Sequence, residues 1–586
     1  MKIGIDFGST YSTVSKYNEN NDTVEALHME EGAPVSIPSA VSIAKIDGSI
    51  TCGEAAKSQT GGLAFTVYDG FKMLLVENDP VIIGSRNYNE KYTPKYITTR
   101  YLESILQGVM RRFGKNKGAG EEYDDIIICM PEIWSKNLST LDGRNILTDI
   151  LKKEISGVKV NNVNVVTEPE AASAYFAHNY EKETNIPFNG HLLLIDYGGG
   201  TLDITLTEVM SDGDGKMEIG YREGCGVGEN HPDSMGNISI GNAGMAYMQG
   251  VIVRALKDCG VERPDCNEPA FKKAVFMFEK NLKAIDGIKK IEDTFSEFGD
   301  YKDFEEILDE EPMIFTFVEY RDKIVIITYQ HLFTAYRDII QDVLYKEVYD
   351  INRKVQEHIK ADPCLPESGN RDDFKIALVG GFGSFYLVKK QLSDIYNITS
   401  YSKNDKRIKN LRTDKSEQAI SLGAALIASG RVILQKTAKF SIGLLTRRST
   451  DAKKNVYYGI TYHQQLVPDK PYFICYHGSE DDSPSNRIIY TNLRNNMNQF
   501  AIGFSDDPKR YSKIPLKNEI LHKLDPLPVY ELCNVGFSIG ENNVVSIHIA
   551  PCFSSGENDK GMVIPLDSYA NMLDLNAAEE EYIDEV

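Results

Sequence analysis

The chain has 586 residues, of which 42% are apolar and 25% are charged, the composition of an ordinary folded protein with room for several domains. Its 64 basic and 85 acidic residues give a formal net charge of −21, which argues against a general binder of nucleic acids or anionic membranes, because phosphate contacts need a basic face. Met1 leads directly into an apolar strand, no uncharged run approaches a membrane span of ~20 residues, and the nine cysteines form no CxxC pair. We therefore expect a cytoplasmic chain with reduced thiols and no membrane segment.

The first predicted element is a hairpin of two strands with glycine in its turn. Residues 2–17 (KIGIDFGSTYSTVSKY) contain an apolar strand that ends at Asp6, a turn around Gly8, Ser9 and Thr10, and a β-branched return strand. Glycine permits close approach of a ligand, and successive N–H groups in a tight turn form a concavity that binds anions. Taken alone, this hairpin is better interpreted as an ordinary structural turn.

Helices are predicted from apolar periodicity before the second hairpin. Residues 92–115 form one, with Thr98 and Thr99 as candidate N-caps and Gly114 at its end, and residues 139–156 form another. A small-residue helix follows the strand that ends at Glu168, with the next residue, a proline, in its first helical position.

The hairpin pattern then occurs a second time. Residues 192–206 (LLLIDYGGGTLDITL) combine an apolar strand, Asp196, glycines at 198–200, Thr201 and a return strand of alternating apolar and polar residues. This period of two means that the glycines join two strands and do not open a helix, as a P-loop or a dinucleotide-binding motif would. The two copies favour a duplicated fold with one phosphate loop from each half, in which Asp6 and Asp196 hold Mg²⁺.

More helices and one glycine turn follow the second hairpin. A helix is expected to begin near residue 241, and residues 271–286 form an amphipathic helix in which Glu279 and Lys283 are spaced i, i+4. In the simplest interpretation these two form a solvated ion pair. The remaining predictions are a long helix at 327–355, a strand, a turn at Gly380 and Gly381, a further helix, and a small-residue helix at 417–430.

These motifs resemble those of the actin, hexokinase and heat-shock ATPase superfamily. Their amino-acid sequences resemble those of the seventy-kilodalton heat-shock chaperones (DnaK-like proteins) in particular. The likeness covers residues 1–430 through five motifs in the same order, namely the two hairpins, TVYDGFKMLL, TEPEAA and LVGGFGSF. It implies an α/β fold, a two-lobed actin-like ATPase with duplicated mixed-sheet domains. The implied cofactors are ATP or ADP with Mg²⁺ between the lobes, and K⁺ is a further candidate cation.

The resemblance also implies roles for single residues. Lys72 would contact the γ-phosphate as a compact point charge, and Glu168 and Thr201 would help it to orient the attacking water. A surface lysine, and an acid that only matches the dipole of a helix N-terminus, remain the alternatives for Lys72 and Glu168. The implied catalytic residues are Lys72, Glu168, Asp196 and Thr201, and the implied metal ligands are Asp6 and Asp196. The implied nucleotide contacts are Gly8, Ser9, Thr10, Tyr11, Gly198, Gly199, Gly200, Asp203, Glu279, Lys283, Gly380, Gly381 and Ser384.

The sequence departs from the family where the adenosine should bind. The family has an arginine that stacks on adenine at the position of Ser384, which here lies between the aromatic residues Phe382 and Phe385. One of these rings would replace the arginine as a stacking platform. Adenine recognition is thus the part of the expected site in which this chain differs most from the family.

Residues 1–430 are therefore predicted to be the ATPase domain, with an interdomain linker at 431–439, a β-sandwich at 440–570 and an acidic tail at 571–586. The short alternating strands after residue 440 favour the sandwich, and KFSIGLLT resembles the start of the family's peptide-binding β-domain. The acidic residues that follow are too few for the family's helical lid, so a lidless domain and a free tail are expected.

The expected function is that of a monomeric, ATP-driven, chaperone-like protein. It would hydrolyse ATP slowly and couple this reaction to the binding of peptides or unfolded proteins, with a co-chaperone or nucleotide-exchange factor as a further partner. A nucleotide-gated scaffold for one specific partner remains the main alternative. A metabolic kinase lacks a motif for an acceptor pocket, and a cytoskeletal filament is disfavoured because actin-like chains lack such a β-domain.

Overall fold

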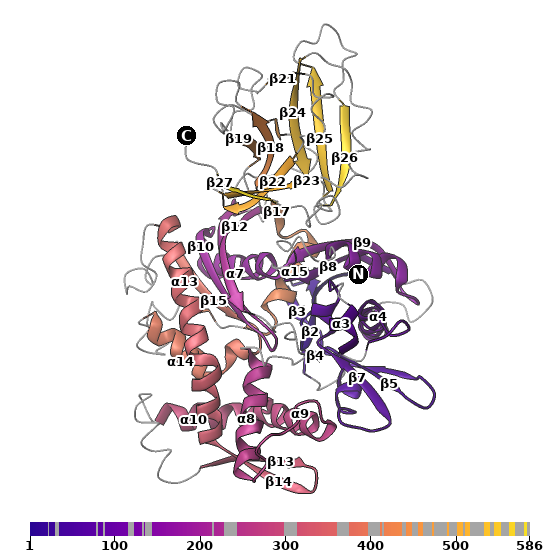
Figure 1. Ribbon diagram of the computed structural model, residues 1–586, viewed down its shortest axis with the longest axis vertical. Coiled ribbons are helices and arrows are strands. Elements are labelled where there is room, and N and C mark those ends of the chain that lie inside the picture. The colour runs from indigo at the N-terminus through magenta and orange to yellow at the C-terminus, as the bar shows by residue number, and fades with distance from the viewer. Residues whose placement is uncertain are drawn as a thin grey trace. The chain divides into compact units, whose positions relative to one another are not determined.

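The computed structural model forms two compact units (Figure 1). The first contains Met1–Met130, Leu147–Gly215 and Arg222–Ile433, and the second contains Pro131–Ile146, Lys216–Tyr221 and Leu434–Val586. Up to residue 435 the structure describes all residues except 22, 30–33, 78–79, 86–87, 115–121, 132–133, 135–142, 214–215, 228–242, 298–312, 360–373, 397–410 and 413–414. Beyond residue 435 it describes 441–447, 455–460, 472–473, 489–491, 501–507, 510–515, 532–539, 544–551, 562–568 and 579–582.

The first unit begins with a mixed sheet built on the N-terminal hairpin. Its order is β3-β2-β1-β8-β9, with β1 (Lys2–Asp6) antiparallel to β2 (Tyr11–Asn18) and parallel to β8 (Glu122–Met130). The outer strands are β3 (Thr23–Ala26) and β9 (Lys159–Thr167). Because Asp6 is the last residue of β1, the turn that follows it lies at the carboxyl edge of the sheet.

The second sheet of this unit repeats that arrangement. β10 (Asn189–Tyr197) is antiparallel to β11 (Leu202–Ser211) and parallel to β15 (Phe374–Val379), which is followed in the sheet by β16 (Leu411–Arg412). Both glycine segments thus join two antiparallel strands, which confirms the period-two prediction. The α/β part of the predicted fold class is also confirmed, and the shared strand order supports a duplicated fold.

Shorter strands complete the first unit. They are β4 (Ile37–Pro38), β5 (Ala40–Ala44), β6 (Ile50–Cys52), β7 (Phe65–Asp69), β13 (Ile314–Tyr320) and β14 (Lys323–Thr328). β5, β6 and β7 form a sheet, and β13 pairs with β14. β12 (Lys216–Val227) and β17 (Ile433–Gln435) have residues in both units.

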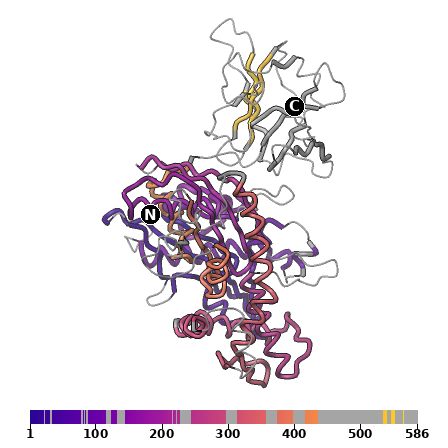
Figure 2. The backbone as a smooth tube through the Cα atoms, turned by 90° about the vertical axis from the view of Figure 1, so that its left-hand side faces the viewer, coloured from indigo at the N-terminus to yellow at the C-terminus, as the bar shows by residue number. Residues whose placement is uncertain are grey.

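Several predicted helices are present with different ends. The helices and helical turns are α1 (Glu54–Lys57), α2 (Phe71–Leu74), α3 (Pro80–Ser85), α4 (Pro94–Phe113), α6 (Gly143–Asp149), η1 (Ile150–Glu154), α7 (Glu168–Thr184), α8 (Gly244–Asp258), α9 (Pro269–Lys283), α10 (Ile285–Glu297), α12 (Tyr329–Tyr336), η2 (Arg337–Gln341), α13 (Asp342–Ile359), η4 (Phe382–Ser384), α14 (Tyr386–Ile395) and α15 (Ala419–Ser429). Figure 2 shows α12, η2 and α13 as one long helical rod.

The predicted cap of α4 is wrong, and so is the predicted end of α9. The N-cap of α4 is Thr93, whose side chain accepts from the N–H of Tyr96, whereas Thr98 and Thr99 bond back to carbonyls one turn earlier. The helix can start this early although its first residue is a proline. Backbone N–H groups in the first turn have no helical partner, so the N–H that proline lacks is not needed there. α9 ends at Lys283 because Ala284 adopts an extended backbone.

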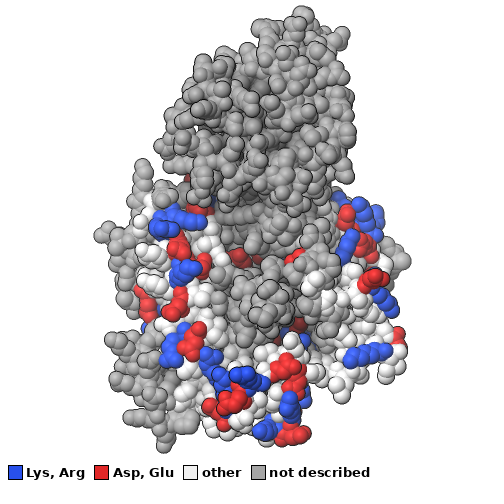
Figure 3. All heavy atoms as spheres, in the orientation of Figure 1, with Lys and Arg blue, Asp and Glu red and all other residues white. Residues whose placement is uncertain are grey.

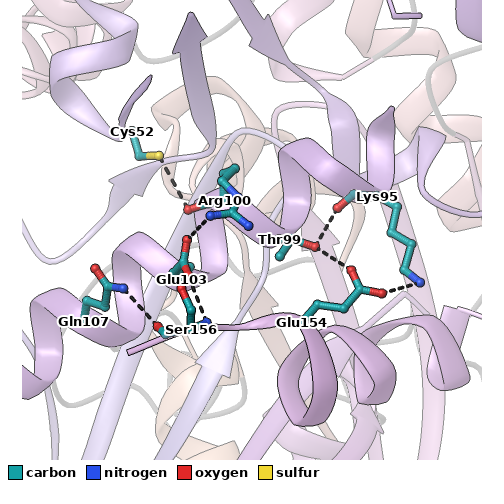
Figure 4. Close-up of polar contacts among 8 residues, drawn as sticks. All are labelled: Cys52, Lys95, Thr99, Arg100, Glu103, Gln107, Glu154 and Ser156. Atoms are coloured by element: carbon teal, nitrogen blue, oxygen red, sulfur yellow. Dashed lines mark hydrogen bonds and ion pairs between the residues drawn. The ribbon is translucent and has the colours of Figure 1, made fainter. Parts of the chain in front are cut away.

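A polar cluster fastens α4 to the segment that follows η1 (Figure 4). The carboxylate of Glu103 is nearly buried, pairs with Arg100 Nη1 at 2.6 Å and accepts from the N–H of Ser156 at 2.9 Å. About two turns earlier on α4, Lys95 pairs with Glu154 at 2.6 Å. These bonds satisfy a carboxylate that would otherwise be costly to bury.

α15 crosses the first unit at a spacing that only glycine allows. It packs against both α7 and β1. A Cβ at Gly423 would lie 1.7 Å from the carbonyl oxygen of Ala171 on α7, and a Cβ at Gly4 would lie 2.3 Å from the backbone nitrogen of Ala425. The predicted small-residue helix therefore does pack tightly, and it ties the first sheet to α7.

The surface of the first unit mixes both signs of charge. On the face drawn in Figure 3, basic and acidic side chains are interspersed over the described surface. Among the described residues, no helix has the length and apolar character to cross a membrane.

The second unit contains two antiparallel sheets. One has the order β19-β18-β22-β23-β27, and the other has the order β20-β24-β25-β26, with β21 also paired to β24. The strands are β18 (Ser441–Arg447), β19 (Asn455–Ile460), β20 (Tyr472–Phe473), β21 (Ile489–Thr491), β22 (Ala501–Asp507), β23 (Arg510–Pro515), β24 (Leu532–Ile539), β25 (Val544–Pro551), β26 (Met562–Ser568) and β27 (Glu579–Tyr582). Every element described beyond residue 440 is a strand, as the alternating pattern predicts.

Two predicted segments, the linker and the acidic tail, agree with the structure only in part. In the predicted linker 431–439, Val432 is buried and residues 433–435 form β17, while residues 436–439 lie outside the described part of the chain. In the predicted tail 571–586, the free conformation is wrong for Glu579–Tyr582, because these residues pair with β23 as β27. The ladder of backbone hydrogen bonds overrides the weak strand preference of glutamate.

We predict that Gly423→Ala lowers the free energy of unfolding of the first unit by about 3 kcal/mol, because the added methyl group meets backbone that cannot rotate away. Chemical unfolding followed by circular dichroism would measure this. Gly84→Ala in α3 is the matched control, since nothing lies within 4 Å of its Cβ, and it should change stability by at most about 1 kcal/mol, in the stabilising direction. Equal effects of the two substitutions would contradict the close approach of α15 and α7.

Candidate functional site

Both glycine turns open on one cavity of the first unit. Asp6 and Asp196, the acidic residues at the ends of β1 and β10, lie in its wall. The other predicted residues that line it are Gly8, Ser9, Thr10, Tyr11, Lys72, Glu168, Gly198, Gly199, Gly200, Thr201, Glu279, Lys283, Gly380, Gly381 and Ser384. Asp203 is not among the lining residues and lies opposite Asp196 in the β10–β11 ladder. Residues from distant parts of the chain thus line one cavity.

The two turns approach each other closely. A Cβ at Gly199 would lie 2.2 Å from the hydroxyl of Thr10, so a side chain there would push the turns apart. The second turn is braced by α8, because the backbone N–H groups of Gly244 and Met245 donate to the carbonyls of Gly198 and Gly199 at 3.2 and 2.8 Å. Sequence reasoning missed this contribution of α8, whose start it placed near residue 241.

A buried ion pair lies between the turns. Lys72, only 3% exposed, donates from its Nζ to Oε1 of Glu168, which is 8% exposed. Lys72 is the second residue of α2, whose N-cap is Gly70, and the φ of 63° at position 70 favours glycine. Glu168 is the first residue of α7, where a capping box between Thr167 and Glu170 fixes the helix start. A surface lysine at position 72 is therefore excluded, and Glu168 does more than match a helix dipole.

Burial and like charges disturb the titration of this cluster. Burial raises the pKa of Asp6 to about 7, the charge of Glu168 contributes in the same direction, and Lys72 partly offsets them. Burial also raises the pKa of Asp196 well above its usual range, with contributions from Glu168 and Asp203. For Lys72, burial acts to lower the pKa, but the attraction of Glu168 and Asp6 prevails and raises it. One ammonium thus faces more negative charge than it can neutralise.

This charge pattern suits a divalent cation. Among the described residues, no group of three or more His, Cys, Asp or Glu side chains is arranged to hold a metal by itself. Asp6 and Asp196 would instead hold Mg²⁺ together with water and phosphate oxygens, the ligands that this ion prefers. Such an ion would replace the protons that the raised pKa values favour. The residues therefore fit the expected metal.

Glu279 is buried, and the solvated ion pair expected from its sequence spacing is wrong. Its carboxylate is 1% exposed, and its oxygens lie 3.3 Å from Lys283 Nζ and 3.7 Å from Lys57 Nζ. Burial acts to raise the pKa of Glu279, but Lys57 and Lys283 prevail and lower it. Lys283 Nζ also lies 3.2 Å from the centre of the Tyr11 ring. Lys57 is not among the predicted site residues, because its contact with Glu279 joins segments far apart in the chain.

The glycine turn after β15 approaches the second hairpin. Gly380 has a φ of 80°, and a Cβ there would lie 2.5 Å from Oδ1 of Asp196. The hydroxyl of Ser384 donates to the carbonyl of Gly381 at 2.7 Å and is exposed. Only glycine can occupy position 380, because any side chain would strike Asp196.

The neighbouring aromatic rings argue against an open stacking platform. Phe382 and Phe385 stack on each other with centroids 5.4 Å apart, and both also contact Tyr247. Both rings are almost fully buried in the hydrophobic core, although they line the cavity. The apolar side chains that accompany them in the cavity wall are Met248, Leu282, Ile288, Ile291, Tyr386 and Ile420.

Comparison with known proteins gives chaperones as relatives. The chain is 29% identical over 230 residues to a heat shock protein of Pyricularia oryzae, a match that covers 35% of this chain and 34% of that protein. It is 28% identical over 223 residues to the chaperone protein DnaK of Nitrosopumilus maritimus, covering 37% and 30%. It is 27% identical over 235 residues to a ribosome-associated molecular chaperone of Zygosaccharomyces rouxii, covering 35% and 34%.

The predicted resemblance to seventy-kilodalton heat-shock chaperones is confirmed by these relatives. The chain spans about a third of the length of the curated relatives it matches. No protein-family model matches it.

Asp6 provides a pH test of the buried cluster. Its pKa rises from 3.8 to about 7 on folding, so the folded, ligand-free chain keeps a proton that the unfolded chain loses. The free energy of unfolding should therefore fall as the pH rises between these values. Asp196, whose pKa is also raised, contributes to the same fall. We therefore predict that Asp6→Asn makes the fall shallower and stabilises the ligand-free chain by about 1–3 kcal/mol above neutral pH, measured as urea-unfolding midpoints across a pH series.

Asp125→Asn on the adjacent strand is the control for this test. Asp125 is half-buried, 4.0 Å from Lys2 Nζ, and away from the cavity. It should leave the pH profile close to that of the parent chain. An Asp6→Asn profile with the slope of the parent would mean that Asp6 is ionised in the folded chain.

Proposed function

We propose that this chain is an ATP-dependent, chaperone-like protein whose residues 1–430 hydrolyse ATP and whose β-domain, residues 440–570, binds peptides or unfolded proteins. The observation that carries this proposal is the meeting of both glycine turns, two half-buried aspartates and the Lys72–Glu168 pair on one cavity. The chaperone relatives support the same conclusion independently.

The two turns would cradle the phosphates of ATP. Backbone N–H groups of Gly8–Thr10 and Gly199–Thr201 would bind the phosphate oxygens, and their closeness at Gly199 and Thr10 would bring both loops onto one phosphate chain. Mg²⁺, held by Asp6 and Asp196 through water, would supply the positive charge that offsets the phosphates. A two-lobed, duplicated fold would then close around the nucleotide.

Hydrolysis would use the buried ion pair directly. With nucleotide bound, the ammonium of Lys72 would turn toward a γ-phosphate oxygen, which frees the carboxylate of Glu168 to accept a hydrogen bond from the attacking water. The hydroxyl of Thr201 would donate to the γ-phosphate and help to align it. The water would attack the γ-phosphorus without a covalent enzyme intermediate, and the products would be ADP and phosphate.

Nucleotide state would reach the β-domain through residues 431–439. ATP and ADP would favour different degrees of closure of the two lobes of the ATPase domain. Only ATP has a γ-phosphate, which would contact Lys72 and both glycine turns at once. We further propose a monomer in the cytoplasm that works with a co-chaperone or a nucleotide-exchange factor.

One observation favours a second candidate, a nucleotide-gated scaffold that binds one partner and hydrolyses little ATP. Ser384 replaces the expected arginine, and Phe382 and Phe385 are packed into the core and do not present an open platform for the base. Weak base contacts would favour slow or absent turnover. Retention of many unfolded model proteins would support the chaperone, whereas one saturable partner would support the scaffold.

We predict that Lys72→Ala and Thr201→Ala each slow ATP hydrolysis by about 10²–10³-fold, since each removes a group that faces the transferred phosphate. Single-turnover assays with Mg²⁺ and radiolabelled ATP would measure the rates. Lys95→Ala, which removes a half-exposed lysine far from the cavity, is the control and should retain the parent rate.

Lys72→Ala also leaves Glu168 buried without its ammonium partner, so stability must be tested separately from catalysis. The double variant Lys72→Ala, Glu168→Gln removes both charges and should recover the unfolding midpoint but not the activity. Tight ATP binding without turnover in the parent would contradict the enzyme and leave the scaffold. Full activity of Lys72→Ala would contradict the role of that lysine.

Removal of residues 436–586 should change the single-turnover rate by about two- to tenfold if the β-domain is coupled to the ATPase. The truncated and parent chains would be compared at saturating ATP, with and without an unfolded client protein. Identical rates for both chains, with and without client, would contradict the coupling while leaving the ATPase intact.

A further inference from the structure

The edge of one sheet in the second unit is occupied by a strand of unusual composition. β27 (Glu579–Tyr582) lies beside β23 (Arg510–Pro515), whose other neighbour is β22 (Figure 1). Among the strands that the structure describes, β27 pairs with β23 alone. Without β27, β23 would be an edge strand with an unpaired row of N–H and C=O groups, which is a template for another strand.

The pairing is short and does not use the whole of β23. The antiparallel register sets Arg510 opposite Tyr582, Tyr511 opposite Glu581, Ser512 opposite Glu580 and Lys513 opposite Glu579. The last two residues of β23 have no partner in β27. A longer extended segment would therefore gain backbone pairing at Ile514 that β27 does not provide.

The two strands have opposite charge. Residues 509–517 (KRYSKIPLK) include four basic residues and no acidic one, although the whole chain carries a net charge of −21. Residues 579–585 (EEEYIDE) include five acidic residues and no basic one. A basic stretch in an acidic protein selects acidic partners, because cross-strand pairs of opposite charge are favourable and like pairs are not.

Sequence preference alone does not hold β27 in place. Glutamate is depleted in strands, and three of the four residues of β27 are glutamates. The preceding strand, β26, belongs to the other sheet, so pairing with β23 is what joins β27 to this one. The pairing with β23, and not an intrinsic strand preference, therefore holds β27 at this edge.

We propose that the outer edge of β23 is a binding site for an extended acidic segment of a partner protein, and that β27 is an internal occupant which this segment displaces. The partner adds a strand antiparallel to β23, with backbone hydrogen bonds for affinity and acidic side chains for selection. Such a site is distinct from the nucleotide site and from the binding of unfolded clients. Because it depends on strand register and charge, an inactive ATPase would leave it intact.

The test uses a fluorescein-labelled peptide with the sequence of residues 577–586 (AAEEEYIDEV) and fluorescence anisotropy with the full chain. Glu579→Lys with Glu581→Lys weakens the internal strand, and this variant should bind the peptide about tenfold more tightly than the parent, because its edge is open for more of the time. Adding Lys513→Glu to that variant should weaken binding by about fivefold. Lys272→Glu, an equal charge change in the first unit, should weaken it by less than about twofold.

Charge exchange tests the register itself. A peptide with lysine at the position of Glu579 should bind the Lys513→Glu variant better than the original peptide does, since these two residues are opposite each other in the ladder. A peptide with glutamines in place of its first three glutamates should bind the parent edge more weakly. Equal binding of the peptide by all variants, or equal binding of the original and the altered peptides, would overturn the proposal.

A disulfide lock provides a second test if the lysine variants fail to fold. Ser512→Cys with Glu580→Cys joins two residues that are opposite in the register. The oxidised chain should not bind the peptide, and reduction should restore binding to the parent level. Peptide binding to the locked chain would overturn the displacement, and light scattering that shows dimers lost in the Glu579→Lys, Glu581→Lys variant would assign the edge to a second copy instead of a partner protein.

Discussion

The burial of charge between two glycine turns is the constraint on which the first unit depends. Lys72 and Glu168 neutralise each other away from water. Burial raises the pKa values of Asp6 and Asp196, and the neighbouring charge of Glu168 adds to this effect, because one ammonium cannot balance three carboxylates. Buried charge without full compensation lowers stability, and proteins retain it where a ligand completes the balance. A metal ion with phosphates would complete it here, so the charge that is costly without ligand would serve to bind one.

Glycine residues place that charge cluster, because they let backbone segments approach more closely than any side chain would allow. Gly199 brings the second turn onto Thr10 of the first, and Gly380 brings the turn after β15 onto Asp196. Gly423 does the same for the scaffold, where it lets α15 cross α7 at a distance that no side chain permits. The two sheets share a strand order, so the same arrangement of hairpin and parallel neighbour delivers an aspartate and a glycine turn twice.

The second unit is governed by a different physical rule, that of covering sheet edges. β23 ends at Pro515, which cannot donate to a ladder, and its remaining edge is covered by β27. Charge carries the selectivity there, since a basic strand faces an acidic one in a chain that is acidic overall. A weak internal strand protects such an edge and can still give way to a stronger partner.

Local sequence was sufficient to predict both hairpins, the strands after residue 440 and the helix α7, whose start was placed one residue too late, because their signals are periodicity, glycine and caps within a few residues. Long-range packing was needed to establish the depth of Lys72, the burial of Glu279 beside Lys57, and the packing of Phe382 into the core. Burial depends on segments far apart in the chain, which local spacing does not encode. The same reason explains β27, since a run of glutamates favours a free tail until the strand that pairs with it is known.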